Sequence, residues 1–366
     1  EGIGAPQGRI HAVDARNDTL FDDWQPVSGY RTALKLLLDM LETHVLGSRL
    51  RAMGYRIAHG GAKFKKPVPL TEHIENELKT LVPLSPVRQP NSIAAIIAAR
   101  TIRPDLVHVA CFDTAFHQKR PELATLTGLR GEDHDPGLRR YGNHGLVFEQ
   151  AVDTLYRNGV HVSRERIIMV HLGADASMCA LKYGTSVETA TDFSSLAGLR
   201  MGIFCGDLER RTILYLLSRK GSKTTQIMRL LSEADEVPDT LTLAHETNTL
   251  LDRFNDPSVI KAVELFCYQA RRHLVSLTAA LSGLDRLVFT GAVGVDAPLL
   301  RARICAGLEY LGILIDTTRN TNGSQMISPP VGNVSVEVIK ADELVTIARH
   351  VRGILRTQSG PKHCVT

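Results

Sequence analysis

Five short apolar runs, rich in β-branched residues and bounded by turn-forming residues, are typical of buried strands. They are residues 55–58, 106–112, 167–171, 287–290 and 334–339, and each leads into a loop rich in Gly, Asp, His or Thr. Segments with helical periodicity lie around them, at residues 30–46, 91–100, 256–281, 297–311 and 342–354. Strands alternating with helices predict an α/β protein in which the loops after the strands carry the chemistry.

Length and charge narrow the class of protein. With 366 residues the chain is long enough for about two or three domains. A net charge of +4, from 43 basic and 39 acidic residues without a block of like charge, argues against a nucleic-acid binder or a polybasic membrane binder. The longest apolar stretches, such as residues 93–99, fall far short of the roughly 18 residues that span a bilayer.

The cysteines and the N-terminus favour a reduced, cytoplasmic setting. The six cysteines form no C-x-x-C pair, so neither a disulfide framework nor a cysteine metal site is expected. The first residues, EGIGAPQGRI, lack the basic-then-apolar order of a signal peptide.

Two loops that follow strands carry charged candidates. Arg56 lies inside an apolar run, where its charge must be paired or directed into a cleft, and Gly60 and Gly61 after it allow a ligand to approach the backbone. A structural ion pair is the alternative for Arg56. Asp113 follows an apolar strand, where α/β folds place catalytic carboxylates and metal ligands, or it caps a helix.

Two further segments suit an anionic ligand. His144, in residues 139–145 (RRYGNHG), stands beside two arginines and suits a phosphate, although such a histidine, taken alone, is more often a structural residue. Residues 289–296 (FTGAVGVD) run from a strand through a glycine-rich turn into a helix, as in a phosphate or nucleotide cradle. This turn lacks the Gly-Lys-Ser/Thr of a Walker A loop, and a simple strand–helix connector is the alternative.

Taken together and in this order, the motifs resemble those of the acetate kinase family, from near Glu1 to about Leu355. They are residues 56–61 (RIAHGG), 84–90 (LSPVRQP), 112–117 (FDTAFH), 139–145, 171–173, 196–207 (LAGLRMGIFCGD), 287–294 and 342–349 (DELVTIAR). The resemblance implies a two-domain α/β fold of the sugar kinase/actin-like (ribonuclease H-like) type, with a cleft between the domains. One domain would comprise residues 1–115 plus 342–366, and the other, on the nucleotide and dimer side, residues 116–341.

The resemblance also implies an activity. The family transfers the γ-phosphoryl group of ATP to acetate or another short carboxylate, needs Mg²⁺, and forms homodimers in the cytoplasm. At matched positions Arg56 would grip the acetate or the phosphoryl group, and Asp113 would orient the acceptor or the metal. His144 would stabilise the equatorial phosphoryl oxygens, and Glu343 would hold Mg²⁺ directly or through water. Further residues would bind the nucleotide: His171, Gly173, Gly291 and Gly294.

Several positions depart from the family pattern. Phe204 replaces a second arginine, and Asp175 stands where the family keeps a glycine near the phosphates. Asn143 and Ser195 make the implied acceptor pocket more polar. The family's Asp-Met-Arg adenosine segment is missing from the shorter passage at residues 241–254, and the chain starts about where the family's N-terminal phosphate hairpin ends. Two hypotheses therefore stand: a working kinase, with an altered acceptor preference in view of the polar pocket, or a catalytically degenerate relative that acts as a binding or interaction protein.

Overall fold

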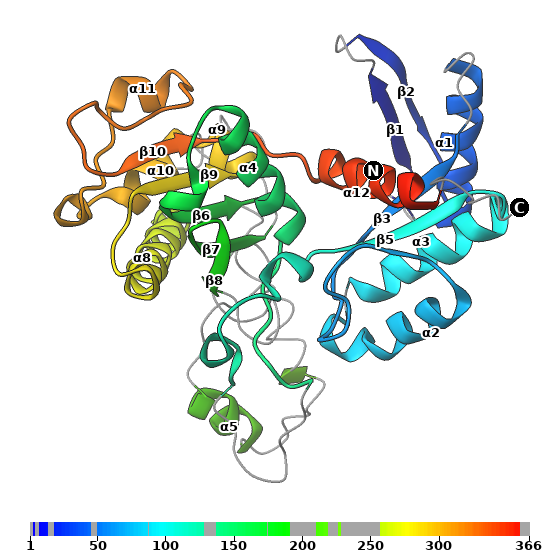
Figure 1. Cartoon of the computed structure of the whole chain (residues 1–366), viewed down its shortest axis with the longest axis horizontal. Coiled ribbons are helices and arrows are strands. Elements are labelled where there is room, and N and C mark those ends of the chain that lie inside the picture. Colours follow the sequence, from blue (N-terminus) through cyan, green and yellow to red (C-terminus); the bar gives the residue numbers. More distant parts are fainter. Residues whose placement is uncertain are drawn as a thin grey trace, which may run out of the picture. The chain divides into compact units, whose positions relative to one another are not determined.

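The chain forms two compact units. The computed structural model describes residues 3, 7–13, 18–44, 50–86, 88–127, 137–173, 175–190, 210–218, 226–227 and 257–358 (Figure 1). Unit 1 comprises Glu1–Gly60, Lys66–Phe112 and Ile347–Thr366, and unit 2 comprises Gly61–Lys65 and Asp113–Thr346. Helix α12 (Glu343–Gln358) begins in unit 2 and continues in unit 1.

Unit 1 is built on a three-stranded sheet in the order β3-β5-β4, in which β3 and β5 are parallel and β4 is antiparallel to β5. Gly54 on β3 allows α12 to pack closely, because a Cβ there would lie 2.4 Å from Cγ2 of Ile347. The strands of unit 1 are β1 (Gly8–Val13), β2 (Thr19–Gln25), β3 (Ala52–Ile57), β4 (Val68–Pro69) and β5 (Val107–Phe112), of which β1 and β2 pair as a separate antiparallel hairpin. Its helices, besides α12, are α1 (Tyr30–His44), α2 (Glu72–Thr80) and α3 (Gln89–Ile102), with a 3₁₀ turn at Val82–Leu84.

Unit 2 is built on a five-stranded mixed sheet in the order β10-β9-β6-β7-β8. Strands β10, β9 and β6 are parallel, and β6, β7 and β8 form an antiparallel meander. The strands are β6 (Arg166–Leu172), β7 (Ala176–Lys182), β8 (Thr185–Thr189), β9 (Arg286–Thr290) and β10 (Ser335–Val338). The helices are α4 (Gly145–Arg157), α5 (Arg210–Ser218), α8 (Pro257–Leu281), α9 (Ala292–Asp296), α10 (Pro298–Cys305) and α11 (Thr317–Thr321). The 3₁₀ turns are Ala115–His117, Glu122–Thr125, Val162–Arg164 and Glu309–Leu311.

Helices cover both faces of the unit 2 sheet at strand β6, whose residues 167–170 are all apolar. Successive side chains of a strand point to opposite faces. Ile168, Val170 and Leu172 pack in a core with α8 and α10, while Ile167 and Met169 pack in a second core with α4. A strand buried on both faces reads as a continuous apolar run, which is the pattern that the sequence shows.

The predicted strands are all present, and the α/β prediction is confirmed. The prediction of one helix over residues 297–311 is wrong. Helix α10 ends at Cys305, the chain reverses at Gly307 with φ +81°, and only a 3₁₀ turn follows. Within the described part of the chain, no helix combines the length and the apolar content needed to cross a membrane.

Candidate active site

His144 has an unusual backbone conformation at the start of α4. Its φ of 56° and ψ of 25° are left-handed, which costs a residue other than glycine roughly 1–2 kcal/mol. Its carbonyl oxygen accepts hydrogen bonds from the N–H groups of Val147 and Phe148, at 3.1 and 3.0 Å. The side chain is 5 % exposed. Strain of this kind persists where the surrounding structure determines the conformation, and it is frequent at functional sites.

The imidazole of His144 is held by two neighbouring strands of the unit 2 sheet. Its Nδ1 lies 2.8 Å from Oγ of Ser177 on β7. Its ring packs on that of His171 on β6, with centroids 4.4 Å apart and planes 30° apart. His171 and Ser177 are opposite each other in the antiparallel β6–β7 register. The pairing of these strands therefore sets where the imidazole lies.

Asp113 and His144 are neighbours through their backbones. Asp113 directly follows β5, and its carbonyl oxygen accepts a hydrogen bond of 2.9 Å from the N–H of Gly145. A Cβ on Gly145 would lie 2.2 Å from that oxygen, so the two segments meet only because residue 145 is glycine. The Asp113 side chain is 4 % exposed. The structure thus brings together two of the residues predicted to be catalytic.

The turn that follows β9 lies against the end of β6. Gly291 has φ +83°, and a Cβ there would lie 2.3 Å from the carbonyl oxygen of Leu172 and 2.9 Å from Cε1 of His171. Beyond Leu172, the N–H of Gly173 donates to the carbonyl oxygen of Asp175, at 2.9 Å. The nucleotide-binding predictions His171, Gly173 and Gly291 therefore fall in one place, beside His144.

Gly291 and Gly294 differ in the space that surrounds them. Packing of the chain on itself excludes a side chain at Gly291. A Cβ on Gly294 would meet its nearest atom, Cβ of Leu172, at an ordinary 3.7 Å. The described structure therefore leaves room for a methyl group at residue 294.

Thr290 was missed by the sequence reasoning. It is fully buried as the last residue of β9, and among the described residues no hydrogen-bond partner is available to its Oγ1. A buried hydroxyl without a partner costs roughly 1–3 kcal/mol. An additional polar group at the β9 turn, such as a phosphate oxygen or a water molecule, would remove this cost. The sequence does place a hydroxyl at the end of an apolar run, just before Gly291.

Glu343 begins α12, whose first turn lies against the first turn of α4. The hydroxyl of Thr346 donates to the carbonyl oxygen of Leu146, at 3.1 Å, and Leu146 is two residues after His144. Glu343 is half-buried. Within the described residues, no group of three or more His, Cys, Asp or Glu could hold a metal ion. Because Mg²⁺ is typically held by one or two carboxylates together with substrate phosphates, Glu343 and Asp113 fit that ion as partial ligands.

Arg56 belongs to unit 1, unlike the other predicted site residues. It lies on β3 opposite Cys111 of β5, and its carbonyl oxygen accepts a hydrogen bond of 3.3 Å from Oγ of Ser92. The loop after it is fixed by the buried side chain of Gln89, which bonds to both the N–H and the carbonyl oxygen of His59, at 3.1 Å each. Burial lowers the pKa of His59 to about 4. The backbone of His59 is therefore fixed by Gln89, and its imidazole is uncharged near neutral pH.

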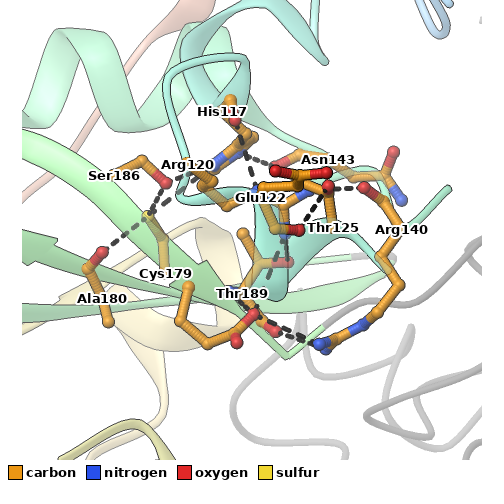
Figure 2. A network of polar contacts seen from close by, with 11 residues as sticks. His117, Arg120, Glu122, Thr125, Arg140, Asn143, Cys179, Ala180, Ser186 and Thr189 are labelled. Atoms are coloured by element: carbon orange, nitrogen blue, oxygen red, sulfur yellow. Dashed lines mark hydrogen bonds and ion pairs between the residues drawn. The ribbon is translucent and has the colours of Figure 1, made fainter. Parts of the chain in front are cut away.

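Arg120 anchors the segment that leads to His144 (Figure 2). Its Nη1 donates to Oγ1 of Thr189 on β8, at 3.0 Å, and its Nη2 donates to the carbonyl oxygen of Arg140, at 2.6 Å. Nη2 of Arg140 in turn donates to the carbonyl oxygen of Thr189, at 3.2 Å. The carboxylate of Glu188 lies 3.8 and 3.5 Å from the two guanidinium groups. Burial lowers the pKa of Arg120 to about 10.

The departures from the family pattern lie partly within the described structure. Asp175 is 9 % exposed, directly before β7. Asn143 is half-buried, and its carbonyl oxygen lies 3.0 Å from Nε2 of His117. Phe204 and Ser195 lie outside the described residues, as do residues 241–254, where the family's adenosine segment is expected to be missing.

Residues 1–349 match the acetokinase family. The chain belongs to this family. An acetate kinase of Rhodopseudomonas palustris (strain TIE-1) is 39 % identical over 356 residues, which cover 96 % of this chain and 89 % of that protein. The resemblance seen in the motifs is confirmed.

Solved structures of acetokinase relatives agree with the sequence match. The crystal structure of Porphyromonas gingivalis acetate kinase superposes with a TM-score of 0.84 at 26 % identity, covering 97 % of this chain and 92 % of the other. A propionate kinase from Francisella tularensis superposes with a TM-score of 0.86 at 26 % identity, covering 96 % and 91 %. The predicted fold class, a two-domain α/β fold of the sugar kinase/actin-like type, is confirmed.

Proposed function

We propose that this chain transfers the γ-phosphoryl group of ATP to the carboxylate of acetate or another short acid, giving ADP and an acyl phosphate. The names of the relatives, acetate kinase and propionate kinase, support this substrate class. The single observation that carries the proposal is His144, held in a left-handed conformation beside Asp113 and packed on His171. The names of these relatives give no support to the alternative, a catalytically degenerate relative.

Positioning and neutralisation of charge are the main requirements of phosphoryl transfer, because two anions must approach each other in line. His144 would donate a hydrogen bond to an equatorial oxygen of the phosphoryl group. Asp113 would orient the acceptor or the metal ion. Arg56 would bind the acetate or the phosphoryl group as a cation. These roles come from the family resemblance, and the geometry of unit 2 supports the first two.

Mg²⁺ and the ATP phosphates would be held by further residues of unit 2. Glu343 and Asp113 would provide carboxylate oxygens to the ion, which would neutralise charge on the phosphates. Thr290 would donate its hydroxyl hydrogen to a phosphate oxygen or to a water molecule bound to it. His171, Gly173, Gly291 and Gly294 would border the same phosphates. We further propose that the two compact units are the two domains of the family.

Assembly and location follow from family membership alone. We propose a homodimer in the cytoplasm, acting on small carboxylates without a nucleic-acid or membrane partner. Light scattering on the purified protein measures its mass against the 40.2 kDa of one chain. A mass of one chain across the micromolar range would exclude the dimer.

Formation of acyl phosphate tests the proposal directly. The protein is incubated with Mg²⁺–ATP and a series of short carboxylates, and the product is trapped as its hydroxamate. We expect saturable turnover that falls at least ~100-fold in His144→Ala. His161→Ala, which changes an exposed histidine of the same unit, is the matched control and should retain full activity. Folded wild-type protein that forms no hydroxamate with any of the acids would refute the proposed function.

A further inference from the structure

Two of the hydrogen bonds of the His117 imidazole, those to Asn143 and Ser186, define its tautomer. Its Nε2 lies 3.0 Å from the carbonyl oxygen of Asn143, which can only accept, so Nε2 carries the hydrogen. Its Nδ1, 2.9 Å from Oγ of Ser186, therefore accepts the hydroxyl hydrogen of that residue. Figure 2 shows both contacts. His117 is thus a neutral donor aimed at the backbone of residue 143.

Close packing and burial hold this donor in place. A Cβ on Gly142 would lie 2.4 Å from Cγ and Cδ2 of His117, so the imidazole rests directly on the backbone before Asn143. The side chain of His117 is 2 % exposed. Burial, together with the nearby charge of Arg120, lowers the pKa of His117 to about 3. The ring therefore stays uncharged throughout the physiological range.

The backbone groups on both sides of His144 are bonded to one short segment, residues 113–117. On one side the carbonyl oxygen of Asn143 accepts from His117, and on the other the N–H of Gly145 donates to the carbonyl oxygen of Asp113. A left-handed residue other than glycine must be held from outside. These two hydrogen bonds fix the backbone immediately before and immediately after His144.

We propose that His117 is a positioning residue for phosphoryl transfer: its Nε2–H fixes the peptide between Asn143 and His144 and so keeps His144 in its left-handed conformation. The inference rests on the role of His144 in the proposed function. It assigns His117 no contact with the substrate and no proton transfer. A loss of His117 should therefore lower the rate of the chemical step more than it weakens substrate binding.

His108 provides a matched control for His117. It is a buried histidine of unit 1 with the same bonding pattern, its Nε2 at 2.9 Å from the carbonyl oxygen of Arg103 and its Nδ1 at 2.6 Å from the hydroxyl of Tyr55. Replacement of either histidine by phenylalanine keeps an aromatic ring but removes both hydrogen bonds. We expect His117→Phe and His108→Phe to lower the melting temperature to a similar degree.

Only His117→Phe should slow the reaction. We expect its kcat to fall at least ~10-fold, with the KM values for ATP and carboxylate within about 3-fold of wild type, while His108→Phe keeps its kcat. The shape of the pH–rate profile should not change, because His117 does not titrate in that range. A folded His117→Phe with the kcat of His108→Phe, or a lost limb in its pH–rate profile, would overturn the proposal.

A second pair of variants serves if the phenylalanine variant does not fold. The side-chain amide of glutamine can place an N–H where Nε2 of histidine lies, whereas the shorter amide of asparagine cannot reach Asn143. His117→Gln should retain most of the kcat and His117→Asn should not. Equal kcat values in these two variants would contradict a role that depends on the bond to Asn143.

A spectroscopic measurement separates this inference from the proposed function. Long-range ¹H–¹⁵N spectra of the histidine side chains report on the environment of the His144 imidazole without any substrate. The His144 signals should shift or broaden in His117→Asn and stay in place in His108→Phe. If wild type forms no acyl phosphate, the proposed function fails while these spectra still test the positioning. Unchanged His144 signals in a folded His117→Asn would refute it.

Discussion

The imidazole rings of His144 and His171 lie 4.4 Å apart, centroid to centroid, with their planes 30° apart. His144 enters from the start of α4, and His171 stands at the end of β6, next to the β9 turn at Gly291. The carboxyl ends of parallel strands such as β6 and β9 are where α/β folds bind ligands. This pair of rings therefore connects the residues predicted to act on the phosphoryl group with those predicted to bind the nucleotide.

Ser177→Ala should weaken the hold on the His144 side chain. The variant removes the partner 2.8 Å from Nδ1, and a buried imidazole nitrogen left without it costs about 1–3 kcal/mol. We expect kcat to fall about 10-fold with little change in the KM for ATP. Steady-state kinetics with acetate and ATP measure both. The control, Ser276→Ala on the exposed side of α8, should have the kcat of wild type. A Ser177→Ala enzyme with the kcat of wild type would argue against a role of the contact between Ser177 and His144.

Gly291→Ala and Gly294→Ala should differ although they lie in one turn. An alanine at residue 291 would place Cβ 2.3 Å from the carbonyl oxygen of Leu172, on a backbone with φ +83°. We expect it to lower the free energy of unfolding by at least ~2 kcal/mol. An alanine at residue 294 meets only ordinary contacts and should cost less than about 1 kcal/mol. Urea unfolding followed by circular dichroism compares them, and equal losses would contradict the packing argument.

The strands around the site could be predicted from the sequence, whereas the meander that holds His144 could not. Strands β6 and β9 each contain a run of large apolar residues, at residues 167–170 and 287–289. Strand β7 (ASMCALK) consists mostly of small residues, and β8 (TSVET) is largely polar, so neither carries a clear strand pattern. Strand β7 nevertheless supplies Ser177. Its partnership with His144 depends on the β6–β7 register, a non-local feature that the local pattern does not encode.

Candidate residues could be chosen from the sequence, whereas their surroundings in the folded chain could not be predicted. Asp113 could be picked because it follows an apolar strand, and His144 because it stands beside two arginines. Their mutual contact depends on Gly145, whose missing side chain matters only once the two segments meet. Thr290 looked like an ordinary strand residue, because the lack of a partner for a hydroxyl is a property of the folded surroundings.

Arg301→Lys should destabilise unit 2 strongly. The guanidinium of Arg301 is 1 % exposed and donates to the carbonyl oxygens of Gly294 and Val295, at 2.8 and 2.6 Å. It also donates to Oδ1 and the carbonyl oxygen of Asn320, at 2.8 and 3.0 Å. Burial lowers the pKa of Arg301 to about 10. Lysine has one nitrogen and cannot span these acceptors, so we expect a loss of about 2–4 kcal/mol in the free energy of unfolding.

Arg271→Lys is the matched control for Arg301→Lys. Arg271 is half-buried and bonds to only two backbone carbonyl oxygens, those of Ile304 and Arg303, at 3.4 and 2.7 Å, whereas Arg301 is buried and bonds to four acceptors. Its replacement should cost less than about 1 kcal/mol. Urea unfolding under the same conditions measures both variants. A similar loss of unfolding free energy in Arg301→Lys and Arg271→Lys would show that the guanidinium of Arg301 is not required to satisfy its buried acceptors.

The buried His117 should make the free energy of unfolding fall as the pH is lowered. Its pKa is about 3 in the folded chain against 6.5 for an unperturbed histidine, so below pH 6.5 the unfolded chain binds a proton that the folded chain does not. Stability therefore falls as the pH is lowered from 6.5 towards 3, by roughly 1.4 kcal/mol per pH unit from this group. Glutamine has no titrating side chain. Between pH 7 and pH 5 the free energy of unfolding of His117→Gln should therefore fall by about 2 kcal/mol less than that of wild type. The free energies of unfolding in urea at the two pH values give the difference, with the exposed His161→Gln as control. An equal loss in His117→Gln and wild type would mean that the folded chain also protonates His117 in this range.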